Sequence, residues 1–271
     1  MTITKLENQE FGFELVTLNY TPEPEATAWY AMHQCYSELD VEIDKLPINH
    51  GAALVKNLLD GHKGHFSPLE HNAITFNAVG FPHSLMQQLT RHRVAVSFSV
   101  QSMRYSGNRI CDVAAMGFDE YDQESDEIAH EIMDSRVCEV IENKQPVERV
   151  MYIRPVGKYP SRNGVFNYTQ EMRDIDVKSA FDNCQFYYEK IGLGMPYEQA
   201  RGQLFFDFRQ NFVVTFNARS LMHVLDLRSK KDAQLEIQIL SNMLFKVFES
   251  WMPNIAKWYA DTRKGKARLA P

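Results

Sequence analysis

The chain has 271 residues, of which 44% are hydrophobic and 24% charged, the balance of a globular protein that buries a sizeable core. Its formal net charge of −6 argues against a general nucleic-acid binder, which usually carries a basic domain or face. Any anionic ligand would therefore have to be held by local arginines.

The cysteines and the hydropathy pattern bound the class of protein further. Cys35, Cys111, Cys138 and Cys184 lie far apart with no Cys-x-x-Cys pair, which predicts reduced thiols in a cytoplasmic protein and neither a disulfide framework nor a zinc site. No apolar run has the length of a signal peptide or of a membrane span.

The first third of the chain predicts helices and one strand. Residues 24–38 and 52–60 have helical apolar spacing, and Gly61 ends the second helix. Asn72 to Val79 alternates and predicts a strand. Pro82 opens a short helix that ends at the Arg91-His92-Arg93 cluster, where positive charge suits a helix C-terminus.

The segment from Arg91 to Tyr105 is the most informative for function. Its middle alternates, with Val94, Val96, Phe98 and Val100 on one face, which is the period of a half-buried strand. Arginines stand before and after this strand, and fixed guanidinium groups can grip a phosphate or a planar anionic heterocycle.

The middle of the chain predicts an exposed segment, a hairpin and two helices. Residues 119–134 are strongly acidic and predict a solvated face, and residues 149–168 predict a hairpin or loop. A long helix follows with Asp176 as its expected N-cap, and Gly192 and Gly194 end it. Pro196 opens the next helix.

The last third predicts a strand over Phe212 to Phe216, then helices over Asn217 to Arg228 and Ala233 to Trp251. The basic tail, residues 262–271, is expected to be flexible. Helices mixed with short, mostly non-sequential strands predict an α+β fold, formed by a single compact domain over residues 1–271, with a mostly antiparallel sheet flanked by helices.

Several side chains have both a structural and a functional interpretation. Arg91, His92, Arg93, Ser102 and Arg104 fit a charged helix end and surface strand about as well as a ligand site. Arg219 and Arg228 sit among apolar residues and need anionic or carbonyl partners, which Asp226 or Glu236 could supply. Arg201 poses the same question.

The segment HKGHFSPLEH contains His62, His65 and His71. A metal site ranks third here, behind a ligand-binding loop and a plain helix start at Ser67-Pro68 with Glu70 in the first turn.

These motifs, taken in order, resemble the flavin-dependent thymidylate synthase family. The matching residues are His65 to His71, Arg91-His92-Arg93, Ser102-Met103-Arg104, Ala200-Arg201 and the block from Asn217 to Arg228. Single motifs are only suggestive, whereas five in the same order are specific.

The sequence departs from the family pattern in three places. Eight residues separate Arg93 from Ser102, where the family has seven, so the turn between them should be bulged or one residue longer. The acidic residue that the family often has shortly before this serine is missing. His223 stands where relatives often have Asn, and it could still donate a hydrogen bond to flavin.

The resemblance implies an FAD enzyme that methylates dUMP to dTMP, with 5,10-methylenetetrahydrofolate as carbon donor and NADPH as reductant. It also implies a homotetramer whose sites are built from several subunits. It assigns Arg228 and His65 to catalysis, with Arg228 stabilising negative charge on the pyrimidine. It assigns dUMP binding to Gln88, Arg91, Ser102, Arg104, Arg201 and Arg228. It assigns FAD binding to Ser67, Glu70, Arg91, His92, Arg93, Asn217, Arg219 and His223, and it implies no metal.

Three alternatives remain from the residues themselves. A relative could transfer a hydroxymethyl group to dUMP or modify another uracil nucleotide. A non-catalytic nucleotide-binding or nucleic-acid-binding module would also use arginine and aromatic side chains, although the acidic net charge counts against it. A structural metal protein would use His62, His65 and His71.

Overall fold

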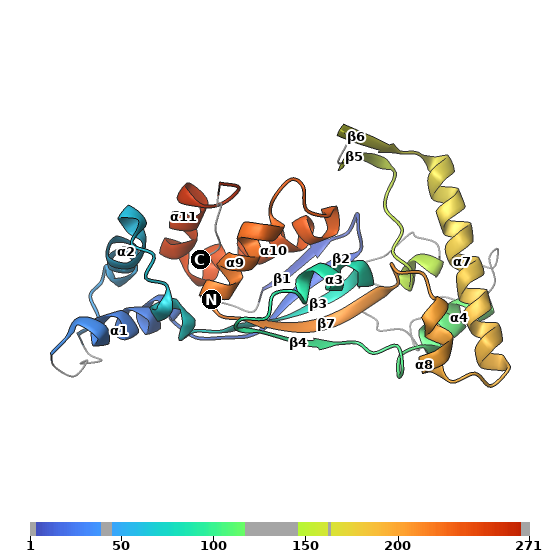
Figure 1. Ribbon diagram of the computed structural model, residues 1–271, viewed down its shortest axis with the longest axis horizontal. Helices are drawn as coiled ribbons and strands as arrows, with labels where there is room; N and C mark the ends of the chain where they lie inside the picture. Colours follow the sequence, from blue (N-terminus) through green and yellow to red (C-terminus); the bar gives the residue numbers. More distant parts are fainter. Residues whose placement is uncertain (1–3, 39–44, 117–145, 162–163, 267–271) are drawn as a thin grey trace.

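The computed structural model describes residues 4–38, 45–116, 146–161 and 164–266. Its centre is a five-stranded antiparallel sheet in the order β1-β2-β3-β7-β4 (Figure 1). The strands are β1 (Lys5–Asn8), β2 (Phe13–Tyr20), β3 (Ile74–Pro82), β4 (Val96–Val100) and β7 (Arg209–Phe216). The predicted α+β class with a mostly antiparallel sheet is confirmed.

One face of the sheet is covered by the C-terminal helices α9 (Ala218–Arg228) and α10 (Leu235–Trp251), and α11 (Pro253–Thr262) packs against α10 (Figure 1). Apolar side chains of β3 and β7, such as Phe76 and Val214, pack with those of α9 and α10 in one large core cluster. Helices α1 (Pro24–Tyr36) and α2 (His50–Leu54) extend this core, and α3 (His83–Leu89) follows β3 directly.

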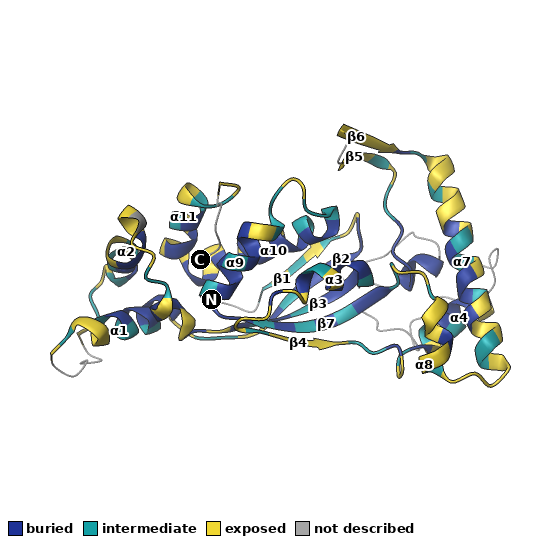
Figure 2. Ribbon diagram, in the orientation of Figure 1, coloured by how far each residue is buried: buried dark blue, intermediate teal, exposed yellow. Residues whose placement is uncertain are grey.

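A second hydrophobic cluster lies at the far end of the molecule, around α4 (Asn108–Met116), α7 (Gln170–Gly192) and α8 (Tyr197–Ala200) (Figures 1 and 2). The outer face of α7 is exposed (Figure 2). The hairpin of β5 (Gly157–Ser161) and β6 (Gly164–Tyr168) precedes α7, which confirms the hairpin interpretation of residues 149–168. The chain thus has two apolar clusters, and the single domain over residues 1–271 stays a prediction.

Arg209 connects the sheet to the segment that leads to the second cluster. Its side chain is 1% exposed, and its guanidinium donates hydrogen bonds to the carbonyl oxygens of Phe11, Gly12, Gly80 and Glu148 at 2.6–3.1 Å. Because one buried side chain satisfies four carbonyl groups, it holds three separate segments together.

Several boundaries differ from the sequence prediction. Thr169, and not Asp176, caps α7, because the Thr169 hydroxyl accepts from the backbone N–H of Met172. Val94 is 86% exposed in the turn before β4 and does not share the face of Val96. The predicted helix over 52–60 is α2 followed by a π-helical turn over Val55–Leu59 and a 3₁₀ turn over Asp60–His62.

Other elements were not predicted from the sequence, namely β1, β2, α4 and α11. Thr262 ends α11, and Arg263 pairs with the buried Asp226 at 2.6 Å, while the flexibility of the tail stays a prediction. Residues 119–134 and Cys138 lie outside the described residues. Further 3₁₀ turns cover Ser67–Glu70, Pro146–Arg149 and Arg201–Gln203.

Within the described ranges, no helix has the length and apolarity that a membrane span requires.

Candidate functional site

A pocket of about 380 Å³ opens where the N-terminus of α9 meets the turn between α3 and β4 and the 3₁₀ turn Ser67–Glu70. Its volume is within the range of small-molecule sites. The pocket collects side chains from three sequence motifs that lie far apart along the chain. The lining residues are Glu70, Arg91, His92, Arg93, Val94, Ala95, Asn217, Arg219, Ser220 and His223.

The start of α9 fixes one wall of this pocket. The Asn217 side chain accepts from the Ser220 backbone N–H at 2.7 Å, and the Ser220 hydroxyl accepts from the Asn217 N–H at 3.0 Å. This reciprocal capping box gives the helix a defined first turn. The Ser220 hydroxyl also lies 3.0 Å from the Ala95 carbonyl oxygen and so anchors the neighbouring turn to the helix.

The turn before β4 has an unusual backbone. Ala95 adopts a φ of 52°, in the left-handed region that non-glycine residues rarely occupy. The backbone between Arg93 and Ser102 turns at Val94 and Ala95, and the bulge or extra residue relative to the family stays a prediction. The turn leaves Arg91 and Arg93 exposed beside the pocket, while His92 is buried beneath them.

The pocket is rich in positive charge. Arg91, Arg93 and Arg219 all line it, and Arg219 pairs with Glu70 at 2.6 Å. The N-terminus of α9 adds the positive end of a helix dipole. Because the Arg219 and Glu70 side chains are 40% and 43% exposed, their ion pair contributes little to stability and remains open to a ligand. The arrangement suits an anionic group such as a phosphate.

His92, which lines this pocket, contacts Arg228, which lies just outside the lining. Arg228 Nε lies 2.9 Å from His92 Nε2, and Arg228 Nη2 donates to the Gln88 carbonyl oxygen at 2.9 Å. Burial lowers the pKa of His92 to about 4, with the positive charges of Arg228 and Arg91 and the nearby His223 acting in the same direction. His92 is therefore neutral near pH 7.

His65 lies outside the pocket lining. Its Nδ1 is 2.9 Å from the Tyr36 hydroxyl, and the two rings meet edge to face. The neighbouring Phe66 ring has the Arg219 and Arg263 guanidinium carbons 5.8 and 5.9 Å from its centroid. Within the described residues, no group of three His, Cys, Asp or Glu side chains is arranged to hold a metal ion.

Three further predicted residues lie at the opposite end of β4. Val96 pairs with Phe216, next to Asn217, whereas Val100 pairs with Phe212, so Ser102 and Arg104 leave the sheet away from α9. Arg104 reaches Glu198 of α8 at 3.6 Å, and Arg201 follows that helix. Arg104 and Arg201 are both exposed. The single chain therefore separates Ser102, Arg104 and Arg201 from Arg228 and Gln88.

The predicted residues are thus gathered in part. Seven of the eight side chains assigned to FAD line one pocket, and the exception is Ser67, which is exposed in the adjoining 3₁₀ turn. The expected partners of the two arginines on α9 were wrong, because Asp226 pairs with Arg263 and Glu236 with Arg154. Sequence reasoning missed Ser220 and Ala95. The Asn217-to-Ser220 capping spacing could have revealed the first, whereas no local signal marks the second.

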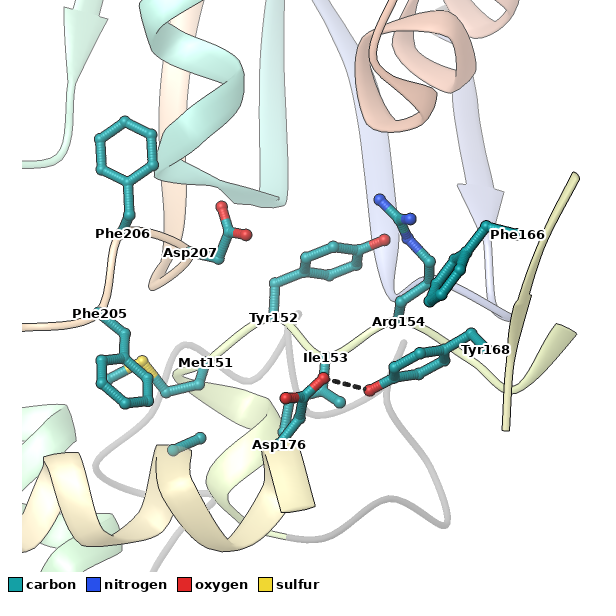
Figure 3. Close-up of a pocket in the computed structure, with 11 residues that line it drawn as sticks. Met151, Tyr152, Ile153, Arg154, Phe166, Tyr168, Asp176, Phe205, Phe206 and Asp207 are labelled. Carbon is teal, nitrogen blue, oxygen red and sulfur yellow. Dashed lines mark hydrogen bonds between the residues drawn. The ribbon is translucent and has the colours of Figure 1, made fainter. Parts of the chain in front are cut away.

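A second cavity, of about 420 Å³, lies beside α7 and contains none of the predicted site residues. Its walls include Tyr152, Phe166, Tyr168 and Phe205, and the Tyr168 hydroxyl donates to Asp176 at 2.6 Å (Figure 3). Arg154, Asp176 and Asp207 supply its charged groups.

Comparison with known proteins agrees with the motifs. The family described as thymidylate synthase complementing protein, Thy1, matches residues 16–254. This chain belongs to that family. It is 35% identical over 222 residues to a flavin-dependent thymidylate synthase of Haloarcula marismortui, covering 80% of this chain and 79% of that relative. It is likewise 35% identical to one of Halobacterium salinarum, covering 77% of this chain and 76% of the relative.

Solved structures of flavin-dependent thymidylate synthases and related enzymes share the fold. The crystal structure of thymidylate synthase X from Helicobacter pylori with FAD and dUMP has a TM-score of 0.62 at 20% identity, covering 90% of this chain and 99% of that one. The UMP/dUMP methylase PolB from Streptomyces cacaoi, bound with 5-Br dUMP, has a TM-score of 0.63 at 19% identity, covering 96% and 97%.

Proposed function

We propose that this chain catalyses the FAD-dependent reductive methylation of dUMP to dTMP, with 5,10-methylenetetrahydrofolate as carbon donor and NADPH as reductant. One observation carries the proposal. Side chains of the 65–71, 91–93 and 217–228 motifs, far apart in sequence, line one cationic pocket in a chain of the flavin-dependent thymidylate synthase family. The cytoplasmic localisation expected from the cysteines stays a prediction.

The pocket residues fit an FAD. Arg91, Arg93 and Arg219 supply guanidinium donors for the pyrophosphate, and the capped N-terminus of α9 favours negative charge at the same place. His223 presents an uncharged ring donor, because burial lowers its pKa. When bound, the flavin supplies the hydride chemistry, and the chain supplies binding, orientation and electrostatics. Ser67 and Glu70 border the same cofactor in this proposal.

Gln88, Arg91 and Arg228 form one part of the proposed dUMP site, next to this pocket. Arg228 would face the pyrimidine and stabilise negative charge that develops on it. His92 holds that guanidinium in place from behind through the Nε–Nε2 contact. His65, oriented by Tyr36, would border the entry of the folate or the nicotinamide.

The other part of the dUMP site would come from a second copy of the chain. Ser102, Arg104 and Arg201 lie at the far end of β4 and are too distant to join Arg228 within one chain. The exposed guanidinium groups of Arg104 and Arg201 fit a phosphate. A homotetramer with sites at subunit interfaces would bring the two parts together, and no described side chain otherwise neutralises Arg201.

Cys111 and Cys184 do not suit the alternative chemistry in which a cysteine attacks the pyrimidine. Burial raises the pKa of Cys184 to about 12, and burial also raises the pKa of Cys111. A thiol that stays protonated near pH 7 is a poor nucleophile. These two described cysteines also lie in the second cluster, away from the pocket.

The test is tritium release from 5-tritiated dUMP, with NADPH, FAD and methylenetetrahydrofolate each omitted in turn. Release that requires all three supports the proposal, and release without folate contradicts it. The mass of the product separates a methyl from a hydroxymethyl group. UMP should be tried beside dUMP, because the fold is shared with a UMP/dUMP methylase. A colourless protein without activity would favour the non-catalytic alternative.

A further inference from the structure

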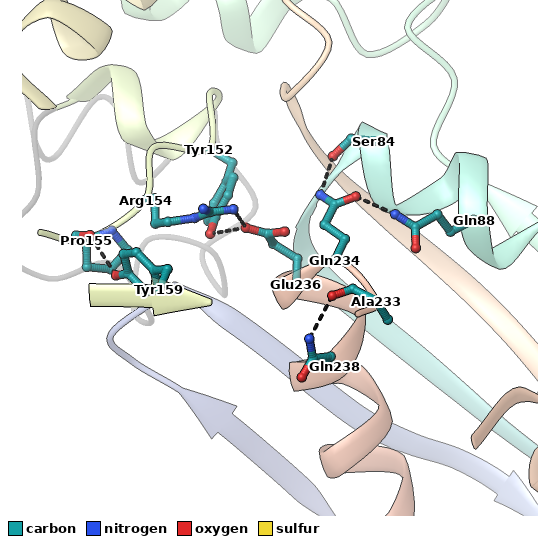
Figure 4. A network of polar contacts seen from close by, with 10 residues as sticks. All are labelled: Ser84, Gln88, Tyr152, Arg154, Pro155, Tyr159, Ala233, Gln234, Glu236 and Gln238. Atoms are coloured by element: carbon teal, nitrogen blue, oxygen red, sulfur yellow. Dashed lines mark hydrogen bonds and ion pairs between the residues drawn. The ribbon is translucent and has the colours of Figure 1, made fainter. Parts of the chain in front are cut away.

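Four polar side chains form a continuous hydrogen-bonded row behind the proposed dUMP site. Gln88 Nε2 donates to Gln234 Oε1 at 2.6 Å, and Gln234 Nε2 donates to the Ser84 hydroxyl oxygen at 3.1 Å. The Gln234 amide thus lies between Ser84 and Gln88 (Figure 4). The Ser84 hydroxyl and its backbone N–H in turn donate to the Asp207 carboxylate.

The chemistry of these groups gives the row a single direction. Burial raises the pKa of the Asp207 carboxyl, whereas the hydrogen bonds from the Ser84 hydroxyl and N–H act in the opposite direction, so the Ser84 hydroxyl gives its one proton to Asp207. The Ser84 oxygen can then only accept from Gln234, whose NH₂ group faces it. The Gln234 carbonyl consequently faces Gln88 and takes a hydrogen from the Gln88 NH₂ group.

The last member of the row, Gln88, is left with its carbonyl oxygen Oε1 available. Gln88 is half-buried, and no side chain or backbone group in the described part of the chain donates to Oε1. Arg228 donates to the backbone carbonyl of the same residue. The residue that carries the free acceptor is thus also the residue whose backbone holds the guanidinium that would face the nucleobase.

We propose that Asp207, Ser84 and Gln234 are positioning residues that lock the Gln88 amide with its carbonyl toward the nucleobase, so that the site selects uracil over cytosine. The inference rests on the proposed function, because it takes dUMP as the ligand near Gln88.

The selection follows from the donors of the two bases. In dUMP the sugar occupies N1, so N3–H is the only N–H donor of the uracil ring, and a fixed carbonyl acceptor pairs with it. In dCMP the N3 atom is an acceptor and would face the Gln88 carbonyl oxygen, which leaves both acceptors unpaired. A Gln88 amide that could rotate would instead offer its NH₂ group to cytosine, and the discrimination would weaken.

The experiment measures the affinities of the FAD-loaded full chain for dUMP and dCMP by isothermal titration calorimetry. The Gln234→Met variant removes both amide groups while keeping a similar volume. We expect the ratio of the dCMP to the dUMP dissociation constant to fall about tenfold, the effect of one hydrogen bond in a polar site. Gln238→Met, the same substitution on α10 at a glutamine outside the row, is the matched control, and its ratio should stay within about twofold of the wild type.

If Gln234 had a purely structural role, its substitution would weaken the binding of both nucleotides alike and leave the ratio of their dissociation constants unchanged. An unchanged ratio in Gln234→Met therefore overturns the positioning role. Ser84→Ala provides a second variant should Gln234→Met not fold, and it should lower the ratio in the same direction. If the wild-type chain binds FAD and dUMP, and both variants keep the wild-type ratio, this inference alone is refuted. A wild-type chain that does not bind dUMP refutes the proposed function with it.

Discussion

Arg228 Nε lies 2.9 Å from His92 Nε2, and an arginine guanidinium can only donate. His92 Nε2 must therefore be an unprotonated acceptor, and the ring is neutral with its proton on Nδ1. The contact joins the last residue of α9 to the centre of the Arg91-His92-Arg93 motif. The two motifs that the sequence places 136 residues apart are thus one structural unit.

The neutral state of His92 predicts a pH dependence of folding stability. Burial lowers the folded-state pKa from 6.5 to about 4, so between these values the unfolded chain binds more protons than the folded chain. The stabilisation is complete above pH 6.5 and is lost as the pH falls toward 4. Linkage gives a loss of about 2 kcal/mol between pH 7.5 and pH 5 from this group. Urea unfolding at the two pH values measures it.

His92→Gln is the control for this experiment, because Gln can still accept from Arg228 and does not titrate. The difference in unfolding free energy between wild type and variant should shrink as the pH is lowered. A difference that is constant between pH 7.5 and pH 5 would show that His92 does not carry a lowered pKa.

The second prediction concerns catalysis by Arg228. Arg228→Ala should reduce dTMP formation at least about 100-fold, the loss typical of removing a group that stabilises developing charge. FAD should remain bound, because Arg228 does not line the pocket that holds the cofactor residues. Turnover and flavin absorbance of the purified variant are measured together. Lys178→Ala, an exposed change on α7, is the control, and it should keep wild-type turnover and flavin content. Near-normal turnover in Arg228→Ala would contradict the assignment.

The sequence predicted these site residues better than it predicted their partners. The motifs named seven pocket residues because these residues match the motifs of the flavin-dependent thymidylate synthase family. The partners of Arg219 and Arg228 come from distant segments, namely Glu70, His92 and the Gln88 carbonyl. No local period encodes such contacts, and so the pairing with Asp226 or Glu236 was wrong.

The fold also divides into elements that a local sequence pattern predicts and elements that depend on distant contacts. Helices with long apolar stripes, such as α10, were predicted almost to the residue, because burial of one face determines them. Strand β1 has only four residues and half-buried or exposed side chains, so its existence depends on pairing with β2 and not on its own pattern. The left-handed Ala95 backbone is likewise held by a contact with the distant Ser220, which no local pattern encodes.

The third prediction tests whether two chains build the dUMP site. Arg201→Ala should raise the dUMP KM about 10- to 100-fold by removing charge-assisted hydrogen bonds, without loss of FAD. Arg201 and Arg228 lie in separate parts of one chain. An equal mixture of Arg201→Ala and Arg228→Ala chains, co-expressed, should therefore regain activity in about one quarter of the sites, since random assembly pairs two intact halves with that frequency.

Steady-state rates at low dUMP concentration measure this regain against each variant alone. Activity that does not exceed the sum of the separate variants, in a mixture shown to co-assemble, would place both arginines of one site on one chain. Unchanged dUMP affinity in Arg201→Ala would remove this residue from the site altogether.

The last prediction concerns the bend in β3 that precedes α3 and its Gln88. Gly80 has a φ of +77°, and a Cβ there would lie 2.4 Å from the Gly12 carbonyl oxygen and 3.5 Å from Arg209 Nη1. Gly80→Ala must therefore strain the backbone and push apart the segments that Arg209 joins, and it should lower the unfolding free energy by about 2 kcal/mol or more. Gly192→Ala is the matched control, because it lies at the helical end of α7 with open space around it and no positive φ, and it should be neutral or stabilise by about 0.5–1 kcal/mol. Urea unfolding of both variants decides, and equal stabilities would show that the close approach of Gly80 to Gly12 is not required.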